Sequence, residues 1–143
     1  MSHPTLALKR AYLSLRRALE HTVKPFHFTG GQFDVLQLLM HNDGLEHRDL
    51  QRRLSIASPT LTNILDVLER EGHIERRSDT PDARIKTIHM SSQARQLCAS
   101  DKFCAAGEAL VRQMFDGFTD DERGAFLNAL VRIETNLDRV IAP

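Results

Sequence analysis

The amino-acid sequence predicts a mostly α-helical chain with one small β-hairpin near its middle. The first observation is a change in the spacing of apolar residues at Gly72, from a helical period before it to alternation after it. The second is that the segments 5–54 and 93–143 repeat apolar residues at intervals of three and four. These two patterns place helices on both sides of a single hairpin.

Two helices are expected at the start of the chain. The first covers residues 5–23, carries one apolar face, and is ended by Pro25. Thr29 and Gln32 form the T-x-x-Q pattern of a capping box, which predicts the beginning of the second helix. The turn-forming residues 42–44 predict its end.

A helix-turn-helix is expected next. A short helix over residues 46–54 is followed by a four-residue break and by a second helix, with Ser58 as its N-cap and Pro59 at its first position. Gly72 is expected to end this second helix as a C′ residue. Its apolar stripe consists of Leu61, Ile64, Leu65 and Leu68. Its opposite face is polar, which is typical of a helix that enters a DNA groove.

Alternating residues after Gly72 predict a two-stranded hairpin. Residues 73–76 and 85–90 alternate apolar and polar side chains, and the turn formers of 78–83 lie between them. The basic residues near its arms and tip are Arg76, Arg77, Arg84 and Lys86. A hairpin alone is equally compatible with ordinary solvating charges and with a wing that grips DNA. Its position directly behind a polar-faced helix favours the wing.

Helices are expected through the rest of the chain. Residues 93–116 form one predicted helix, and Thr119 with Glu122 forms a capping box that opens the last one. A near-heptad apolar seam on that last helix consists of Phe126, Leu130, Ile133, Leu137 and Ile141. Because the terminal helices cannot enclose much core alone, a second copy of the chain is expected to cover them. The alternative is an intramolecular bundle that closes on the middle of the chain.

Composition limits the possible functions. The 143 residues, 27% charged and 41% hydrophobic, are typical of a soluble globular protein. No segment approaches the roughly 18 apolar residues of a membrane span, and no signal-peptide pattern is present, so a cytoplasmic location without a membrane partner is expected. The net charge is zero, and residues 30–91 hold eight basic and ten acidic residues. Non-specific affinity for nucleic acid should therefore be modest and depend on a few arginines, which include the cluster Arg48, Arg52 and Arg53.

Motifs for catalysis and for metal binding are absent from the sequence. There is no phosphate loop and no G-x-S-x-G, and the seven histidines and two cysteines lack the spacing of metal ligands. An enzyme, a metal site and a cofactor are therefore not expected. Cys98 and Cys104 lie on one predicted helix, too far apart along its axis to bond to each other. Buried, unreactive thiols are favoured over a disulfide between subunits.

The ordered motifs resemble the MarR family of bacterial winged helix-turn-helix transcriptional regulators. The resemblance covers nearly the whole chain and is most specific in T-L-T-N-I-L-D-V-L-E-R-E-G-H-I-E-R-R, followed by D-T-P-D-A-R and I-H-M-S. These segments look like the family's recognition helix, its Asp-x-Arg wing motif and its closing strand. The resemblance implies a winged helix-turn-helix lobe over residues 29–91 that binds DNA. It also implies a helical dimerisation region over residues 1–28 and 92–143 of the same integrated chain.

The resemblance further implies which residues bind DNA. They are Ser58, Thr60, Thr62, Asn63, Arg76, Arg77, Arg84 and Lys86. The first four would face the major groove, where Asn63 could pair with an adenine edge. Arg84 would enter the minor groove with Asp82 orienting it, and Arg76 and Arg77 would contact phosphates.

Three positions depart from the family pattern. Asn63 and Val67 stand where the family often has arginine, and Ala83 replaces a frequent arginine of the wing. Each replacement removes a potential contact to phosphate or base, in agreement with the neutral net charge. Sequence preference is therefore expected to differ from that of commoner members of the family.

The resemblance implies a ligand- or stress-responsive regulator, expected to be a repressor, that binds a pseudo-palindromic operator in double-stranded DNA as a homodimer. A small-molecule effector such as an aromatic acid would bind between the dimer helices and the DNA-binding lobe. Tyr12, Arg16 and His41 are the polar residues that could reach that position. The alternative function is a winged-helix protein-interaction module without specific DNA binding, which the acidic balance of residues 30–91 suggests.

Overall fold

The computed structural model describes residues 3–142 and divides into two compact units, one that extends to Gly107 and one that begins at Glu108. The first unit contains α1 (Pro4–Val23), η1 (Lys24–Phe26), α2 (Gly30–His41), β1 (Leu45–Glu46), α3 (His47–Leu54), α4 (Ser58–Arg70), β2 (Ile74–Arg77), β3 (Thr87–Met90), α5 (Ser92–Cys98) and the beginning of α6 (Asp101–Met114). The second contains the end of α6 and α7 (Asp120–Ile141). The predicted fold class, mostly α-helical with a small β-hairpin, is confirmed.

Both predicted capping boxes are present. At α2, the Thr29 hydroxyl accepts a hydrogen bond from the Gln32 amide at 3.2 Å, and the Gln32 side chain accepts one from the Thr29 amide at 3.0 Å. At α7, Thr119 and Glu122 make the same reciprocal pair at 3.1 and 3.0 Å. Each pair satisfies two amides that a helix N-terminus otherwise leaves without partners, which explains why the helices begin there.

The core of the first unit is built around α2 and α4. The predicted apolar stripe of α4 is confirmed, because Leu61, Leu65 and Leu68 are fully buried and Ile64 packs at their edge. They meet the buried face of α2, formed by Val35, Leu36 and Leu39. Burial of each such side chain contributes about 1.5–3 kcal/mol relative to exposure. This packing determines which face of α4 remains in solvent.

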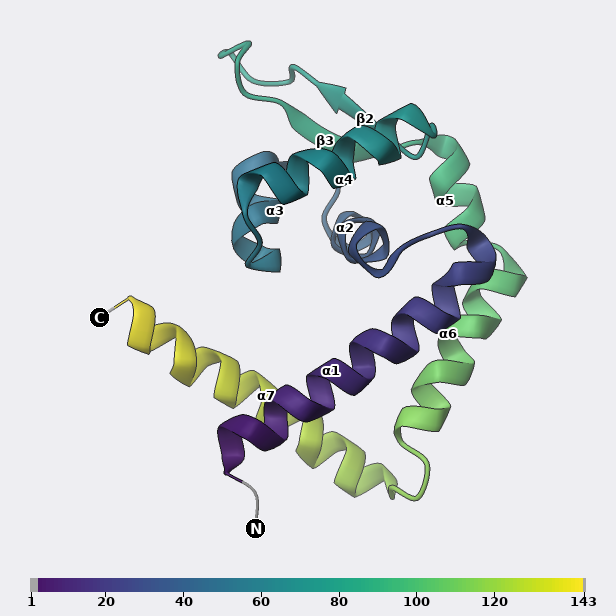
Figure 1. Ribbon diagram of the computed structural model, residues 1–143, viewed down its shortest axis with the longest axis vertical. Coiled ribbons are helices and arrows are strands. Elements are labelled where there is room, and N and C mark those ends of the chain that lie inside the picture. The colour runs from purple at the N-terminus through teal and green to yellow at the C-terminus, as the bar shows by residue number, and fades with distance from the viewer. Residues whose placement is uncertain (1–2, 143) are drawn as a thin grey trace. The chain divides into compact units, whose positions relative to one another are not determined.

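A three-stranded antiparallel sheet replaces the predicted two-stranded hairpin. Its strand order is β1-β3-β2, with Leu45 opposite Ile88 and Arg77 opposite Thr87. The second strand of the hairpin begins at Thr87 instead of residue 85. The two residues of β1 are too few to show a period, so the sequence pattern missed this strand. Figure 1 shows the loop between β2 and β3 extending away from the helices of the first unit.

The predicted C-terminal end of α4 is confirmed, and the predicted N-cap is wrong. Ser58 is the first helical residue and Ala57 the N-cap, so the prediction that Ser58 caps the helix is wrong. The Ser58 hydroxyl instead lies 3.0 Å from His47 Nε2 on α3, a partner that the local pattern does not contain. Gly72 does end the helix in the left-handed region, at a φ of 80°. The Gly72 amide donates to the Glu69 carbonyl and the His73 amide donates to the Leu68 carbonyl, as in a Schellman motif.

The predicted single helix over residues 93–116 is divided in two. α5 ends at Cys98 and α6 begins at Asp101, because the Ser100 hydroxyl accepts a hydrogen bond from the Phe103 amide at 3.3 Å and starts a new helix. Cys98 and Cys104 therefore lie on different helices, and the prediction that one helix holds both is wrong. The Cys104 thiol donates to the Cys98 carbonyl at 3.5 Å, and burial raises the pKa of the Cys98 thiol. Both cysteines are free thiols, but only Cys98 is buried; Cys104 is exposed, so the prediction of a buried thiol is wrong for Cys104.

Large apolar side chains remain exposed on α1 and α7. Val23 is the only buried residue of α1 among those described, and no described residue of α7 is buried. On α7 the predicted seam is accessible, with Leu137 53% exposed and Ile133 41% exposed. Phe115, Phe118 and Phe126 contact each other edge to face at the beginning of the second unit. None of the described helices is apolar over a length sufficient to span a membrane.

Candidate nucleic-acid interface

The solvent face of α4 presents a row of short polar side chains. Thr60, Thr62 and Asn63 are all exposed, while the leucines of the opposite face hold the helix to the core. Ser58 is exposed at the N-terminal end of the same row. Hydroxyl and amide groups can bond either phosphates or base edges, and a single α-helix fits the major groove of B-DNA. The structure therefore brings together four of the residues predicted to bind DNA.

The loop between β2 and β3, residues 78–86, presents Arg84 at its surface; we call this loop together with the two strands the wing. The Arg84 side chain is 91% exposed, yet it is oriented by two hydrogen bonds to Asp82, from Nε at 3.1 Å and from Nη2 at 3.0 Å. The Arg84 amide also donates to Asp82 Oδ1 at 3.0 Å. These hydrogen bonds lower the pKa of Asp82 and raise that of Arg84, so both remain charged at neutral pH.

Arg76 is placed differently from the prediction that it contacts phosphate. Its guanidinium donates to Asp66 and to Glu69 of α4, each at 2.8 Å, and only 23% of its side chain is exposed. Both terminal nitrogens of the guanidinium therefore donate to carboxylates of the protein. Arg76 therefore links β2 to α4, and the spacing of residues in the sequence did not reveal this link.

The other predicted cations of the wing are less constrained. Arg77 is half exposed and pairs with Glu75 at 3.0 Å. Because an exposed ion pair contributes little free energy, a phosphate could take the place of Glu75 at little cost. Lys86 is exposed and donates to the Ser78 hydroxyl. On α3, Arg48 and Arg52 pair with acidic residues close to them in the chain, at 2.9 and 3.1 Å. Much of the basic charge in this unit is thus neutralised locally.

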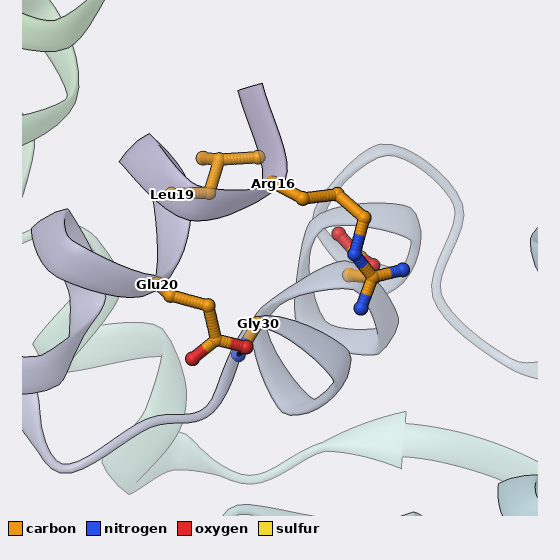
Figure 2. A pocket seen from close by; sticks show the side chains of 5 residues that line it. Arg16, Leu19, Glu20 and Gly30 are labelled. Carbon is orange, nitrogen blue, oxygen red and sulfur yellow. Dashed lines mark hydrogen bonds between the residues drawn. The ribbon is translucent and has the colours of Figure 1, made fainter. Parts of the chain in front are cut away.

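A small recess lies between α1 and α2, within the first unit. It is lined by Arg16, Leu19, Glu20, Gly30 and Asp34. Figure 2 shows Arg16 and Glu20 directed from α1 towards α2, where Glu20 Oε1 accepts a hydrogen bond from the Gly30 amide at 2.7 Å. Burial raises the pKa of Asp34, although the charge of Arg16 acts in the opposite direction. The cavity volume is about 10 Å³, enough for a water molecule and too little for an aromatic acid.

Only one of the three predicted ligand residues lines that recess. Arg16 lines the recess. Tyr12 does not, but its hydroxyl accepts a hydrogen bond from Arg16 Nη1 at 3.2 Å. His41 is exposed at the end of α2 and does not line it. Within residues 3–142, no group of three or more His, Cys, Asp or Glu side chains is arranged to hold a metal ion.

Comparisons with known proteins find similar sequences among HTH-type transcriptional regulators. The sequence model of the MarR family matches residues 28–86, from just before α2 to the end of the wing loop. The regulator TtmR of Methylorubrum extorquens, an HTH-type transcriptional regulator, is 34% identical over 131 residues, which cover 92% of this chain and 62% of TtmR. The chain spans about two thirds of the length of the curated relatives it matches.

Solved structures share the fold over almost the entire chain. A MarR transcriptional regulator from Methanosarcina mazei superposes with a TM-score of 0.85 at 21% identity, covering 95% of this chain and 96% of that one. The Staphylococcus aureus MepR–DNA complex gives a TM-score of 0.79 at 20% identity, covering 96% and 99% of the two chains. The fold of this chain is therefore the winged helix-turn-helix fold of these proteins.

Proposed function

The chain belongs to the MarR family, and from that premise we propose that it is a transcriptional regulator that binds a pseudo-palindromic DNA operator as a homodimer. The observation that carries the proposal is the combination of two exposed elements in one unit. One is the polar face of α4, and the other is the wing, on which Asp82 holds Arg84 extended into solvent.

In this proposal α4 reads the major groove and the wing reads the minor groove. Thr60 and Thr62 bond phosphates or base edges, and Asn63 pairs with the N6 and N7 of an adenine. Arg84 enters a minor groove narrowed by A·T pairs, where the negative potential is strongest. Arg77 and Lys86 contact phosphates beside the wing. Arg76 contributes indirectly, because it is directed at Asp66 and Glu69 and fixes the wing to α4.

The homodimer is supported by the apolar side chains that α1 and α7 leave in solvent. Leu6, Leu13 and Tyr12 of α1 are at least half exposed, and Val131 and Leu137 of α7 are 62% and 53% exposed. Apolar surface of this extent in one chain is typical of an association surface. We propose that residues 1–28 and 92–143 form the dimerisation region and that residues 29–91 form the DNA-binding lobe. Two identical lobes related by a two-fold axis match the two halves of a palindromic site.

We further propose that the protein is a repressor that responds to a small molecule such as an aromatic acid. Binding to a promoter-proximal operator would exclude polymerase, and a ligand would relieve this exclusion by changing the distance between the two DNA-binding lobes. Arg16 is the cation suited to a carboxylate in the recess between α1 and α2. Because the recess of the single chain is small, an aromatic ring would need space supplied by the second copy or by movement of α1.

Titration of labelled DNA from upstream of the protein's own coding sequence tests the proposal. Fluorescence anisotropy should show saturable binding at physiological salt that is about 10³-fold tighter or more than binding to scrambled DNA of equal length. Equal, weak binding to both DNAs that disappears at physiological salt would overturn the proposal. That outcome would favour a winged-helix module for protein interaction, in line with the ten acidic and eight basic residues of 30–91.

A further inference from the structure

His89 on β3 lies between two carboxylates that come from distant parts of the chain. Its Nδ1 is 3.1 Å from Asp43 Oδ2, and its Nε2 is 2.9 Å from Asp79 Oδ2. Only 14% of the His89 side chain is exposed. The ring also lies against Gly44, where an added Cβ would come within 3.0 Å of the ring. Both ring nitrogens are thus committed to acidic partners in a confined position.

Asp43 is anchored independently of His89. Its Oδ1 accepts the Met90 amide at 2.9 Å, and its Oδ2 accepts Arg95 Nη2 of α5 at 2.7 Å. These two donors hold the Asp43 carboxylate whatever the state of the imidazole. The third charged neighbour is Glu75, which is paired with His89 in the strand register but directs its carboxylate to Arg77.

Asp79 depends on His89. Asp79 stands near the start of the wing loop, two residues beyond the end of β2. Within residues 3–142 its side chain has two hydrogen-bond partners, His89 Nε2 and the Thr87 hydroxyl, the latter at 3.0 Å. Thr87 Oγ1 is also 2.8 Å from His89 Nε2 and 3.3 Å from the Arg77 carbonyl. A hydroxyl carries one hydrogen, so Thr87 can donate to only one of these three acceptors at a time.

The number of protons on the imidazole decides whether this arrangement is satisfied. A protonated ring has two N–H donors, one for each carboxylate, and leaves the Thr87 hydrogen free for Asp79. A neutral ring has a single N–H and cannot donate to both carboxylates. When that N–H stays towards Asp43, the lone pair of Nε2 faces the Asp79 carboxylate, and Asp79 keeps at most the hydrogen of Thr87, for which Nε2 competes. Asp43 still keeps Met90 and Arg95.

We propose that His89 is a positioning residue of the wing and acts as a proton-dependent latch. When protonated, His89 connects the wing loop, through Asp79, to the anchored Asp43. When it loses its proton, Asp79 is released from His89 and the loop that carries Arg84 gains freedom. Ordering a free loop on DNA costs conformational entropy, so operator affinity should fall as the pH rises through the range in which histidines change charge. The DNA-binding consequence rests on the function proposed above, whereas the latch itself does not.

Nuclear magnetic resonance tests the latch without DNA. Ring ¹⁵N signals report the protonation of His89, and amide signals of residues 78–86 report the wing, between about pH 5 and about pH 8. We expect the wing amides to shift with the same midpoint as the His89 ring and to lose order on its high-pH side. In the control His21→Gln, which removes an exposed histidine of α1, the wing should behave as in the wild type. Wing amides that do not follow the His89 ring would overturn the proposal.

Two variants separate the latch from a structural role of the residue. Asp79→Asn supplies an amide that can donate to a neutral ring and accept from a protonated one, so the wing should stay ordered across the whole range. His89→Gln should keep its fold, reported by circular dichroism, and lose the pH dependence of the wing amides. A wing that still titrates in Asp79→Asn would contradict the proposal, even if His89→Gln failed to fold.

Operator titration at the two ends of the pH range supplies the second readout. Wild type and His21→Gln should bind at least about fivefold more tightly at the low end, the lower range of a typical coupling between sites, and Asp79→Asn should show no such ratio. A wing that titrates with His89 in a protein that binds no operator at any pH would refute the function proposed above and leave the latch intact. Operator binding with a wing that ignores His89 would refute the latch alone.

Discussion

Arg84 Nε lies 3.1 Å from Asp82 Oδ1 while Arg84 Nη2 lies 3.0 Å from Asp82 Oδ2, so one edge of the guanidinium is occupied by the carboxylate beside it. The other edge remains in solvent, since 91% of the side chain is exposed. The pair restricts the rotation of a long side chain before any partner arrives. An arginine oriented in this way loses less entropy on binding than a free one.

Replacement of Arg84 by alanine should weaken operator binding by about 1–3 kcal/mol. It should also lower the slope of log affinity against log salt concentration by about one, because about one fewer ion is released on binding. The thermal midpoint should be unchanged, because the residue makes no contact with the core. Anisotropy titrations at several salt concentrations measure both quantities, with Lys102→Ala, an exposed cation of α6, as the matched control. An unchanged affinity for Arg84→Ala would remove the wing from the interface.

Asn63→Ala should relax base discrimination at one position of each half-site. The loss should be about 1–3 kcal/mol on the preferred operator and small on scrambled DNA, because an amide that pairs with adenine edges contributes only where the adenine is present. Binding to a set of single-base operator variants measures it. Equal losses on operator and scrambled DNA would assign Asn63 to the phosphate backbone.

Removal of Arg76 should have a different signature from removal of Arg84. Arg76→Ala leaves Asp66 and Glu69 without their partner, and we expect a loss of about 1 kcal/mol in the free energy of unfolding, given the partial exposure of all three side chains. Operator affinity should fall with no change in the salt dependence, because no phosphate contact is lost. A decrease of about one ion in the salt slope would instead show that Arg76 reaches a phosphate.

Aspartate at Leu130 and Leu137 should prevent dimer formation. In a dimer that covers the α7 seam these substitutions bury charge without partners, at a cost of several kcal/mol. Sedimentation velocity should show a dimer for the wild type and a monomer or an unfolded chain for the variant. Thr135→Asp, which adds one negative charge on the opposite side of α7, should remain dimeric. A wild-type protein that sediments as a folded monomer at micromolar concentration would contradict the dimer and the palindromic operator together.

Several patterns of the sequence that depend on neighbours within one helical turn were confirmed. Thr29 and Gln32 cap α2, and Gly72 ends α4 in the left-handed region, as predicted. The apolar stripe of α4 is the buried face. These features follow from hydrogen bonds and packing rows that recur every three or four residues, so a short segment contains all the information that determines them. The polar face of α4 could be identified for the same reason.

Features that join distant segments were decided only by the tertiary structure. Ser58 does not cap α4, and its hydroxyl lies beside His47, eleven residues earlier. Arg76 pairs with α4 instead of remaining free for phosphate. His89 reaches Asp43 across 46 positions of the chain. The energy of such contacts depends on which segments the core brings together, and the spacing of residues along one segment carries no record of it. The local pattern of the sequence identifies the polar face of α4 and the basic residues of the hairpin, and only the tertiary structure shows which of those charges are already paired within the chain.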